Sequence, residues 1–357
     1  MEISRPDLSK LKSGNEMKIV YLEPRASFRE NLRSDSLWGL ICWGIKTLYS
    51  DEELESFIAG YSEGYPLKIS SAFRYIKEGG TITRFFPKPQ LPPFNFQEML
   101  EGKGKSEKMK IFNRLKEWKS QKMVTEEVFF KFLSGNLKEI DFFNESSLWD
   151  SDRLGKHFKE EAEIHNSINR LTGSTNPVKT EDGKEEGKTG GLFSRDEIFT
   201  KTGGLFFLMD GEEKYLRMAE SVLRYYSHTG LMGDSSTGKN HFFIKFDNYQ
   251  MPEVKNPGSF ISLSLYLPKE EETAFYQSDP QSCYYELETR KGKISTGHLN
   301  TTDFWKDSVL SFKEGSVFKA TSKPGYGTIK KVKEITGPKS FSVYHFGAAF
   351  DIPARIL

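Results

Sequence analysis

The sequence is poor in the features that mark secreted, disulfide-bonded or membrane proteins. Only two of its 357 residues are cysteines, Cys42 and Cys283, too few for a disulfide framework or a thiolate zinc site. The longest near-apolar stretch, residues 37–45, is less than half of a membrane span. The polar start, residues 1–10, lacks the apolar region of a signal peptide. These absences predict a soluble protein of a reducing cytoplasm, without a membrane partner.

An excess of charge of either sign is also missing. Lys and Arg together number 51 and Asp and Glu number 50, which gives a net charge of +1. A bulk electrostatic attraction to nucleic acid or to a membrane is therefore excluded. Any basic site must come from local clustering of Lys and Arg side chains.

One segment does cluster positive charge. Residues 102–122 contain eight Lys or Arg and two Glu, and Ile111, Leu115 and Trp118 recur at the spacing of one helix face. The pattern predicts an amphipathic basic helix. Such a helix could contact RNA by phosphate binding and stacking, or it could be a solvated face with its aromatic side chains in the core. The sequence leaves both possibilities open.

Known signatures of metal and nucleophilic catalysis are absent. None of the six His residues pairs with another at the spacing of a metal site, and no G-x-S-x-G motif occurs. We therefore expect no metal, no other cofactor and no catalytic residue.

Candidate strands and helices alternate along the chain, but not as regular βαβ units of one length. This mixture favours an α+β fold over a doubly wound sheet. Aromatic residues make up 14% of the chain and Phe alone contributes 29 residues, enough for a sizeable core. The clearest predictions are strands at 17–22, 205–209, 241–246 and 260–267, helices at 37–45 and 51–59, and a helix capped by Asp210 and Glu213.

Residues 233–240 resemble a phosphate-binding P-loop, with Asn240 where that loop needs Ser or Thr for Mg²⁺. The P-loop also needs a strand before it and a helix after it, so that the phosphates meet a helix N-terminus. Here the predicted order is helix, loop, strand. Both tests fail, and we expect no nucleoside triphosphatase activity.

The same loop has a second interpretation as a cradle for an RNA backbone. Six of the nine residues 230–238 are Gly, Ser or Thr, which leaves backbone N–H groups open to a phosphodiester. Lys239 and His241 add donors at its end, and Arg170 could grip a phosphate with two hydrogen bonds. An ordinary flexible turn and a solvated arginine remain the alternatives.

Several short motifs, in this order, resemble the Csm-type, Cas5-like RAMP subunit of type III-A CRISPR effector complexes. Each motif alone is weak, and the ordered set is fairly specific. The motifs are SDSLWGL at 34–40, SAF at 71–73, FPKP at 86–89, NRLT at 169–172, the loop at 230–238, GSVF at 315–318 and VYHFG at 343–347.

The resemblance implies two ferredoxin-like (RRM-like) domains with a glycine-rich loop, at residues 1–250 with insertions and at 251–357. It implies a non-catalytic subunit, active in antiviral defence, that binds the repeat-derived 5′ tag of the CRISPR RNA (crRNA). It also implies docking to the large Cas10-like cyclase-polymerase subunit and to the first backbone Csm-type RAMP subunit. The RNA-binding residues predicted on this basis are Ser34, Arg170, Gly230, Gly233, Ser236, Gly238, Lys239 and His241.

The chain departs from the family pattern in three places. Residues 27–29 replace a His-Phe-Gly, and in the loop Met232, Ser235, Asn240 and His241 replace a Gly, an Arg, a Gly and an Arg. The charged stretch 179–191, which we predict to be a surface loop or hairpin tip, matches no motif. The alternative function is a metal-independent RAMP endoribonuclease that processes precursor crRNA, with His241 as general base.

Overall fold

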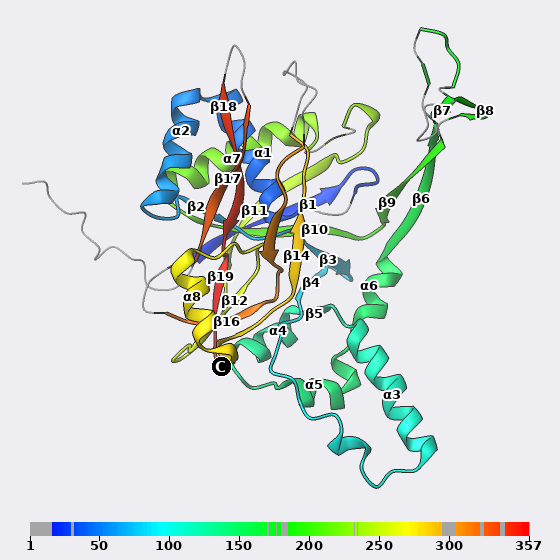
Figure 1. The fold of residues 1–357 in the computed structure, drawn as a ribbon, viewed down its shortest axis with the longest axis vertical. Helices are drawn as coiled ribbons and strands as arrows, with labels where there is room; N and C mark the ends of the chain where they lie inside the picture. Colours follow the sequence, from blue (N-terminus) through cyan, green and yellow to red (C-terminus); the bar gives the residue numbers. More distant parts are fainter. Residues whose placement is uncertain are drawn as a thin grey trace, which may run out of the picture.

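The computed structural model shows a mixed α/β chain built around two antiparallel sheets (Figure 1). None of the helices among the described residues has the length and apolar content needed to cross a membrane. The residues described are 16–29, 32–166, 168–169, 171–175, 177–179, 185–190, 192–231, 233, 235–294, 305–321, 325–335 and 340–356.

The first sheet has a ferredoxin-like core. Its strands lie in the order β11-β1-β10, and β10 continues onto β2 and β3, with every neighbour antiparallel. If β2 and β3 count as one interrupted strand, this is the 4-1-3-2 order of a βαββαβ unit. The elements of the unit are β1 (Glu16–Pro24), α1 (Ser34–Leu48), α2 (Asp51–Ala59), β2 (Leu67–Ile69), β3 (Phe73–Glu78), β10 (Gly203–Gly211), α7 (Glu213–Thr229) and β11 (Phe242–Gln250).

A long insertion between β3 and β10 adds strands, helices and an extended hairpin. β4 and β5 extend the first sheet, and β6 pairs with β9 in a long ribbon beside the body of the molecule (Figure 1). The insertion contains β4 (Thr81–Pro87), α3 (Lys105–Ser120), β5 (Met123–Thr125), α4 (Glu126–Leu133), α5 (Glu139–Asn144), α6 (Ser151–His157), β6 (Phe158–Asn166), β7 (Pro177–Lys179), β8 (Glu185–Gly190) and β9 (Leu192–Thr200).

The second sheet repeats the same strand order. Its sequence of neighbours, β19-β12-β16-β13, is again 4-1-3-2, but a β17–β18 hairpin takes the place of the second helix. The predicted α+β class with two ferredoxin-like units is confirmed, and the boundary at residue 250 stays a prediction. The elements are β12 (Ser259–Ser262), α8 (Glu270–Ser278), β13 (Cys283–Tyr284), β14 (Leu287–Arg290), β15 (Val309–Phe312), β16 (Val317–Lys319), β17 (Gly327–Ile335), β18 (Phe341–Ala348) and β19 (Asp351–Ala354).

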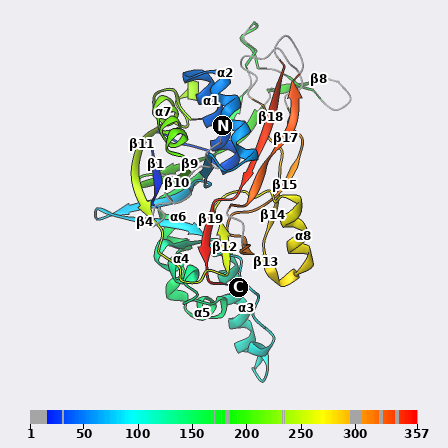
Figure 2. The same ribbon diagram turned by 90° about the vertical axis from the view of Figure 1, so that its left-hand side faces the viewer.

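Helix α1 joins the two units, because β18 of the second unit packs against it (Figure 2). Trp38 of α1 stacks on Phe346 of β18 with ring centroids 5.6 Å apart, and its indole N–H donates to the Tyr61 hydroxyl at 3.0 Å. At the start of α1, Arg33 pairs with Glu288 at 2.7 Å and Asp35 pairs with Arg290 at 3.2 Å. Stacking and ion pairs together hold the units in one arrangement.

Two predicted element boundaries are wrong, each for a local reason. Asp210 does not cap α7, because it is still paired with Lys68 in the sheet and the helix begins only after Glu212. The strand expected at 260–267 stops at Ser262, where serine hydroxyls bond to the backbone: Ser262 Oγ donates to Ser264 O at 2.9 Å. Such local bonds compete with a regular ladder.

A glycine sets how closely α1 and α7 approach. A Cβ built on Gly44 would lie 2.1 Å from Cγ1 of Val222 in α7, whereas a Cβ on Gly39 of the same helix would meet nothing within 4 Å. We predict that Gly44→Ala destabilises the chain by about 1–3 kcal/mol through overpacking. We expect Gly39→Ala to be neutral or stabilising by up to about 1 kcal/mol, because alanine favours helix.

Chemical denaturation of the purified chain measures both changes in the free energy of unfolding. Adding Val222→Ala to Gly44→Ala relieves the contact, so we expect it to recover part of the loss. Equal effects of the two glycine substitutions would contradict this account of the helix contact.

Candidate functional site

The glycine-rich loop connects α7 to β11. A helix precedes it and a strand follows it, so it lacks the strand-loop-helix order of a P-loop, as the sequence predicts. Within the loop, Ser235–Thr237 form one short 3-10 turn, and Gly238 N donates to Ser235 O at 3.0 Å. The loop is therefore a shaped connection with part of its backbone bonded internally.

Asn240 anchors the loop from inside. Its side chain is 4% exposed, and its backbone has the left-handed φ of +56° that asparagine tolerates better than most residues. The side-chain Oδ1 accepts from the Arg29 backbone N–H at 3.0 Å, and Nδ2 donates to Gly233 O at 2.9 Å. The residue that breaks the P-loop motif therefore fixes the fold of this loop to the segment after β1.

Gly230 and His241 close the base of the loop. Gly230 has φ of +88°, and a Cβ there would lie 2.4 Å from Cβ of Ser235. The imidazole Nε2 of His241 lies 3.0 Å from Ser235 O, and since a carbonyl only accepts, Nε2 carries the proton. The half-buried His241 ring thus supports the loop from below.

Lys239 is engaged by acidic groups of the β6–β9 hairpin. Its ammonium lies 2.5 Å from Glu197 Oε2 and 3.1 Å from Glu163 Oε2, and it donates to Ser27 Oγ at 2.9 Å. The Glu197 side chain is only 1% exposed. The expectation that Lys239 is dispensable for the fold is therefore wrong, because its removal would leave a buried carboxylate without a cation.

The same contacts control the ionisation of Glu197. Burial acts to raise the pKa of this carboxyl, but hydrogen bonds from Lys239 and Ser27 outweigh it and hold the pKa below its ordinary value. Lys239 responds in the opposite sense: the bond to Glu197 raises the pKa of its ammonium. Both groups are therefore charged at neutral pH.

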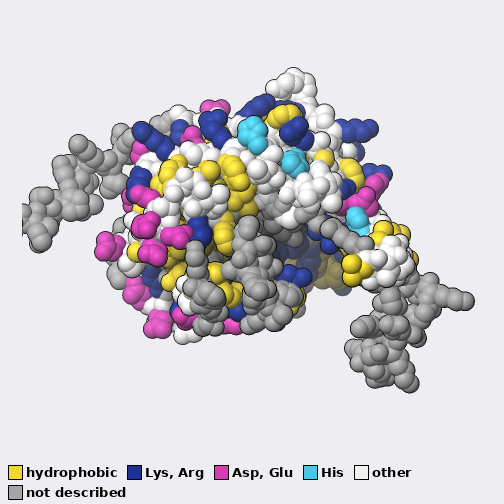
Figure 3. Space-filling model, turned by 90° about the horizontal axis from the view of Figure 1, so that it is seen from above, with side chains coloured by type: hydrophobic (Ala, Val, Ile, Leu, Met, Phe, Trp, Pro, Cys, Tyr) yellow, Lys and Arg dark blue, Asp and Glu magenta, His cyan; other side chains and the backbone are white. Residues whose placement is uncertain are grey.

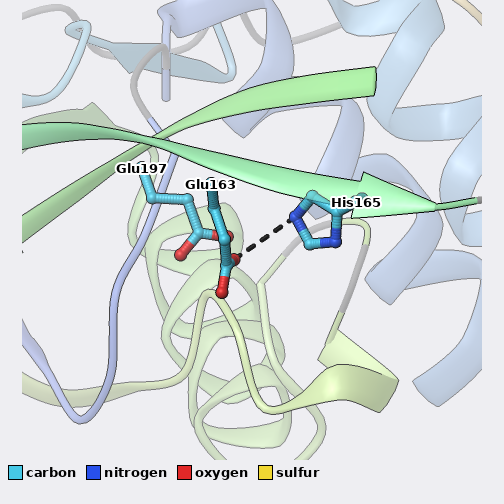
Figure 4. Close-up of side chains that lie close together, drawn as sticks. All are labelled: Glu163, His165 and Glu197. Atoms are coloured by element: carbon cyan, nitrogen blue, oxygen red, sulfur yellow. Dashed lines mark ion pairs between the residues drawn. The ribbon is translucent and has the colours of Figure 1, made fainter. Parts of the chain in front are cut away.

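Glu163, His165 and Glu197 form the one cluster of possible metal ligands among the described residues, with their ligand atoms within 4.8 Å of one another (Figure 4). Glu163 also pairs with His165 at 3.3 Å. The Lys239 ammonium contacts both carboxylates and supplies the positive charge that a metal would bring. We therefore assign no metal to this cluster.

The outer side of the loop is open. A Cβ at Gly233 or Gly238 would meet no described atom within 4 Å, and both residues are exposed. The exposed Ser236 makes no side-chain hydrogen bond to any described residue. A ligand can therefore approach the backbone at these three predicted positions without displacing protein atoms.

A hollow of about 440 Å³ lies next to the loop, at the end of α7 and the start of β11. Arg25 lies over the Phe243 ring at 4.9 Å from its centroid, and 57% of Phe243 is exposed. Lys245 follows on the same face of β11, exposed and 3.3 Å from Glu23. The residues that line the hollow are Glu23, Arg25, Ser227, His228, Phe242, Phe243, Ile244 and Lys245.

The sequence analysis did not assign the cationic and aromatic side chains of this hollow. A signal for two of them was present, because Phe243 and Lys245 alternate with the inward Phe242 and Ile244 along a predicted strand. Nothing in the sequence pointed to Arg25, which the antiparallel pairing of β1 with β11 brings beside Phe243.

Two predicted RNA-binding residues do not belong to this site. Ser34 is fully buried at the start of α1, where its hydroxyl accepts from the Leu265 N–H at 3.0 Å, so it links the two units instead of facing a ligand. Arg170 lies outside the described residues.

Charge is not gathered in one block over the molecule. On the face shown in Figure 3, Lys, Arg, Asp and Glu side chains all occur, and the acidic ones gather toward its left side. This distribution agrees with the net charge of +1, so anion binding has to be argued from individual sites.

Comparisons with known proteins give both a family and a fold. Residues 255–354 match the family model of the CRISPR Csm4 C-terminal domain. No curated protein sequence matches the chain. The whole chain is similar in fold to a chain of the Csm3-Csm4 subcomplex of the type III-A CRISPR-Cas interference complex, with TM-score 0.59, 17% identity, and coverage of 95% of this chain and 100% of that one.

A chain of the Csm1-Csm4 cassette in complex with cA4 is also similar, with TM-score 0.57, 18% identity, and coverage of 96% of this chain and 99% of that one. These findings confirm the resemblance to Csm-type RAMP subunits that the motifs indicated. The fold likeness extends over both ferredoxin-like units and the insertion.

The Lys239–Glu197 pair generates a prediction about stability. Because breaking one side of a buried pair leaves an unpaired charge, we expect Lys239→Ala to lower the free energy of unfolding by about 3 kcal/mol. The double variant Lys239→Ala/Glu197→Gln should recover much of that loss. Lys46→Ala, which breaks the exposed pair with Asp51, is the control and should cost less than about 1 kcal/mol.

The pH dependence of unfolding checks the same pair. The pKa of Glu197 is depressed in the folded state, so its contribution is complete above the unfolded pKa of about 4.3 and is lost as pH falls through the folded value. Glu197→Gln should flatten the stability profile in that acidic range. An unchanged profile would show that the pair does not couple ionisation to folding.

Proposed function

We propose that this chain is a non-catalytic, Csm4-type subunit of a cytoplasmic type III-A CRISPR effector complex that acts in antiviral defence. The observation that carries the proposal is the fold likeness along the whole chain, which covers 95% of this chain and 100% of the chain in the Csm3-Csm4 subcomplex. The match of residues 255–354 to the Csm4 C-terminal domain supports it independently from the sequence.

The partners follow from the same likeness. The solved structures pair Csm4 with Csm1 in one case and with Csm3 in the other. In this proposal the chain docks a large Cas10-like subunit and the first backbone Csm-type RAMP subunit. Because the two units are fixed to each other through α1, both docking surfaces keep a constant relative position.

Within that complex, the chain binds the repeat-derived 5′ tag of the crRNA at the glycine-rich loop and the adjacent hollow. The open backbone at Gly233 and Gly238 gives a phosphodiester access to N–H donors. Phe243 offers an exposed ring for a base, and Arg25 and Lys245 offer cations for phosphates. Single-stranded RNA is bound by this combination of stacking and backbone contacts.

Lys239 and His241 hold the loop in shape instead of gripping RNA directly. Their polar atoms already contact Glu197, Glu163 and Ser235. The support that His241 gives the loop also weighs against its use as the general base of an endoribonuclease. Cleavage of a repeat RNA by the chain that His241→Ala abolishes would favour the alternative function over this one.

Two sets of variants test the tag site in the complex reconstituted with its partners. Gly233→Ala adds a methyl group into open space, so we expect intact folding and weaker binding, because the phosphodiester can no longer approach. We expect Arg25→Gln/Lys245→Gln to weaken tag binding roughly tenfold or more. It should lower the log–log salt slope by about 1.4, or about 0.7 per phosphate contact on a single strand.

The control removes the same charge elsewhere. Lys46→Gln/Lys214→Gln changes two exposed lysines that form ion pairs with Asp51 and Glu53. Lys214 lies at the start of α7, whereas the hollow lies at its end. The control should leave affinity and slope unchanged. If Gly233→Ala and the Arg25/Lys245 pair both behave like the control in folded complexes, the loop and the hollow are not the tag site.

A further inference from the structure

Helix α3 of the insertion is bound to the protein along one side only. Both views place it at the end of the molecule away from α1 and α2 (Figures 1 and 2). Its inner side is held by Trp118, whose ring lies 6.0 Å from that of Phe143, and by Arg114, whose Nε donates to Phe143 O at 2.9 Å. None of its residues is fully buried.

The outer side of α3 carries a lysine face without acidic residues. On a helix with 3.6 residues per turn, six side chains project within an arc of about 100° on the side opposite Trp118. Met109 and Phe112 within this arc are 58% and 44% exposed. The lysine face consists of Lys105, Lys108, Met109, Phe112, Lys116 and Lys119.

The four lysines of this face form no ion pair with any described residue. Elsewhere many exposed lysines do, such as Lys46 with Asp51 and Lys214 with Glu53. The two acidic residues of α3 do not neutralise the face: Glu107 accepts from the Gly104 N–H at 3.2 Å, and Glu117 lies outside the arc. The face therefore presents uncompensated positive charge on a nearly neutral protein.

We propose that the lysine face of α3 is a second, sequence-independent contact for single-stranded RNA, separate from the glycine-rich loop. From Lys105 to Lys119 the face extends about 21 Å along the helix axis. At about 3.4 Å per stacked nucleotide, it spans roughly six phosphates of one strand. The exposed Phe112 ring and the Met109 side chain between the lysines offer apolar surface for bases.

RNA fits this face better than an acidic protein partner does. A protein interface of this size is typically apolar at its centre and depleted in lysine, whereas here lysines lie along the whole length of the face. The proposal goes beyond the tag site and holds for RNA of any sequence.

The test measures binding of a labelled uridine 20-mer to the full chain over a salt series. Lys105→Glu/Lys108→Glu/Lys116→Glu should weaken binding at least tenfold and lower the log–log salt slope by about 2. Glutamate has a helix propensity close to that of lysine and is favourable near a helix N-terminus, so α3 should persist. Circular dichroism checks this. Arginine at the same three positions keeps the charge and should preserve affinity and slope.

The matched control reverses three dispersed, exposed lysines, Lys156, Lys201 and Lys255, and so changes the net charge equally. It should retain most of the affinity. Equal losses in the control and the α3 variant, or no loss in either, would overturn the proposal. Intact RNA binding combined with failed assembly with the large or backbone subunit would also overturn it, in favour of an acidic protein partner.

The outcome is independent of the tag site. Loss of uridine 20-mer binding in the α3 variant with tag recognition retained supports the second contact. Loss of tag binding in Gly233→Ala without any effect of the α3 variant supports the tag site and contradicts the second contact.

Discussion

The buried carboxylate of Glu197 needs a cation, and the chain supplies it from the glycine-rich loop. The ammonium of Lys239 meets Glu197 at 2.5 Å and Glu163 at 3.1 Å, so one interaction joins the β6–β9 hairpin to the loop. Asn240, the next residue, then fixes the loop to the segment after β1. With its base held this tightly, the loop can expose Gly233 and Gly238 without losing its shape. A preorganised backbone of this kind loses little entropy when it binds an extended strand.

A second constraint fixes the position of the two ferredoxin-like units. The stack of Trp38 on Phe346 lies in a core shared by both units, and ion pairs of Arg33 and Asp35 surround the start of the same helix. Buried pairs of this kind set orientation more than they add stability, because their desolvation offsets much of the attraction. A rigid two-unit body suits a subunit that must hold an RNA end while it contacts two protein neighbours.

The sequence predicted local structure well where the signals were local. The helix at Asp51–Ala59 was predicted to the residue, because Ser50 caps its start and Gly60 follows its end. The loop was placed correctly between a helix and a strand. The role of Lys239 was not predictable, since its partners Glu197 and Glu163 are 42 and 76 positions away in the chain. Arg25 and Phe243 meet only because β1 and β11 pair, which neither segment announces alone. Ser34 looked accessible because burial between units depends on the complete fold.

Photocrosslinking tests the central claim most directly. A crRNA with a photoreactive uridine in its 5′ tag is assembled with the chain, the large subunit and the backbone subunit, and crosslinked peptides are identified by mass spectrometry. The account predicts crosslinks from the tag to residues 230–245, above all at Phe243, and their loss in Gly233→Ala. Crosslinks from the tag to the other subunits alone, or to this chain only at sites remote from the loop and the hollow, would contradict it.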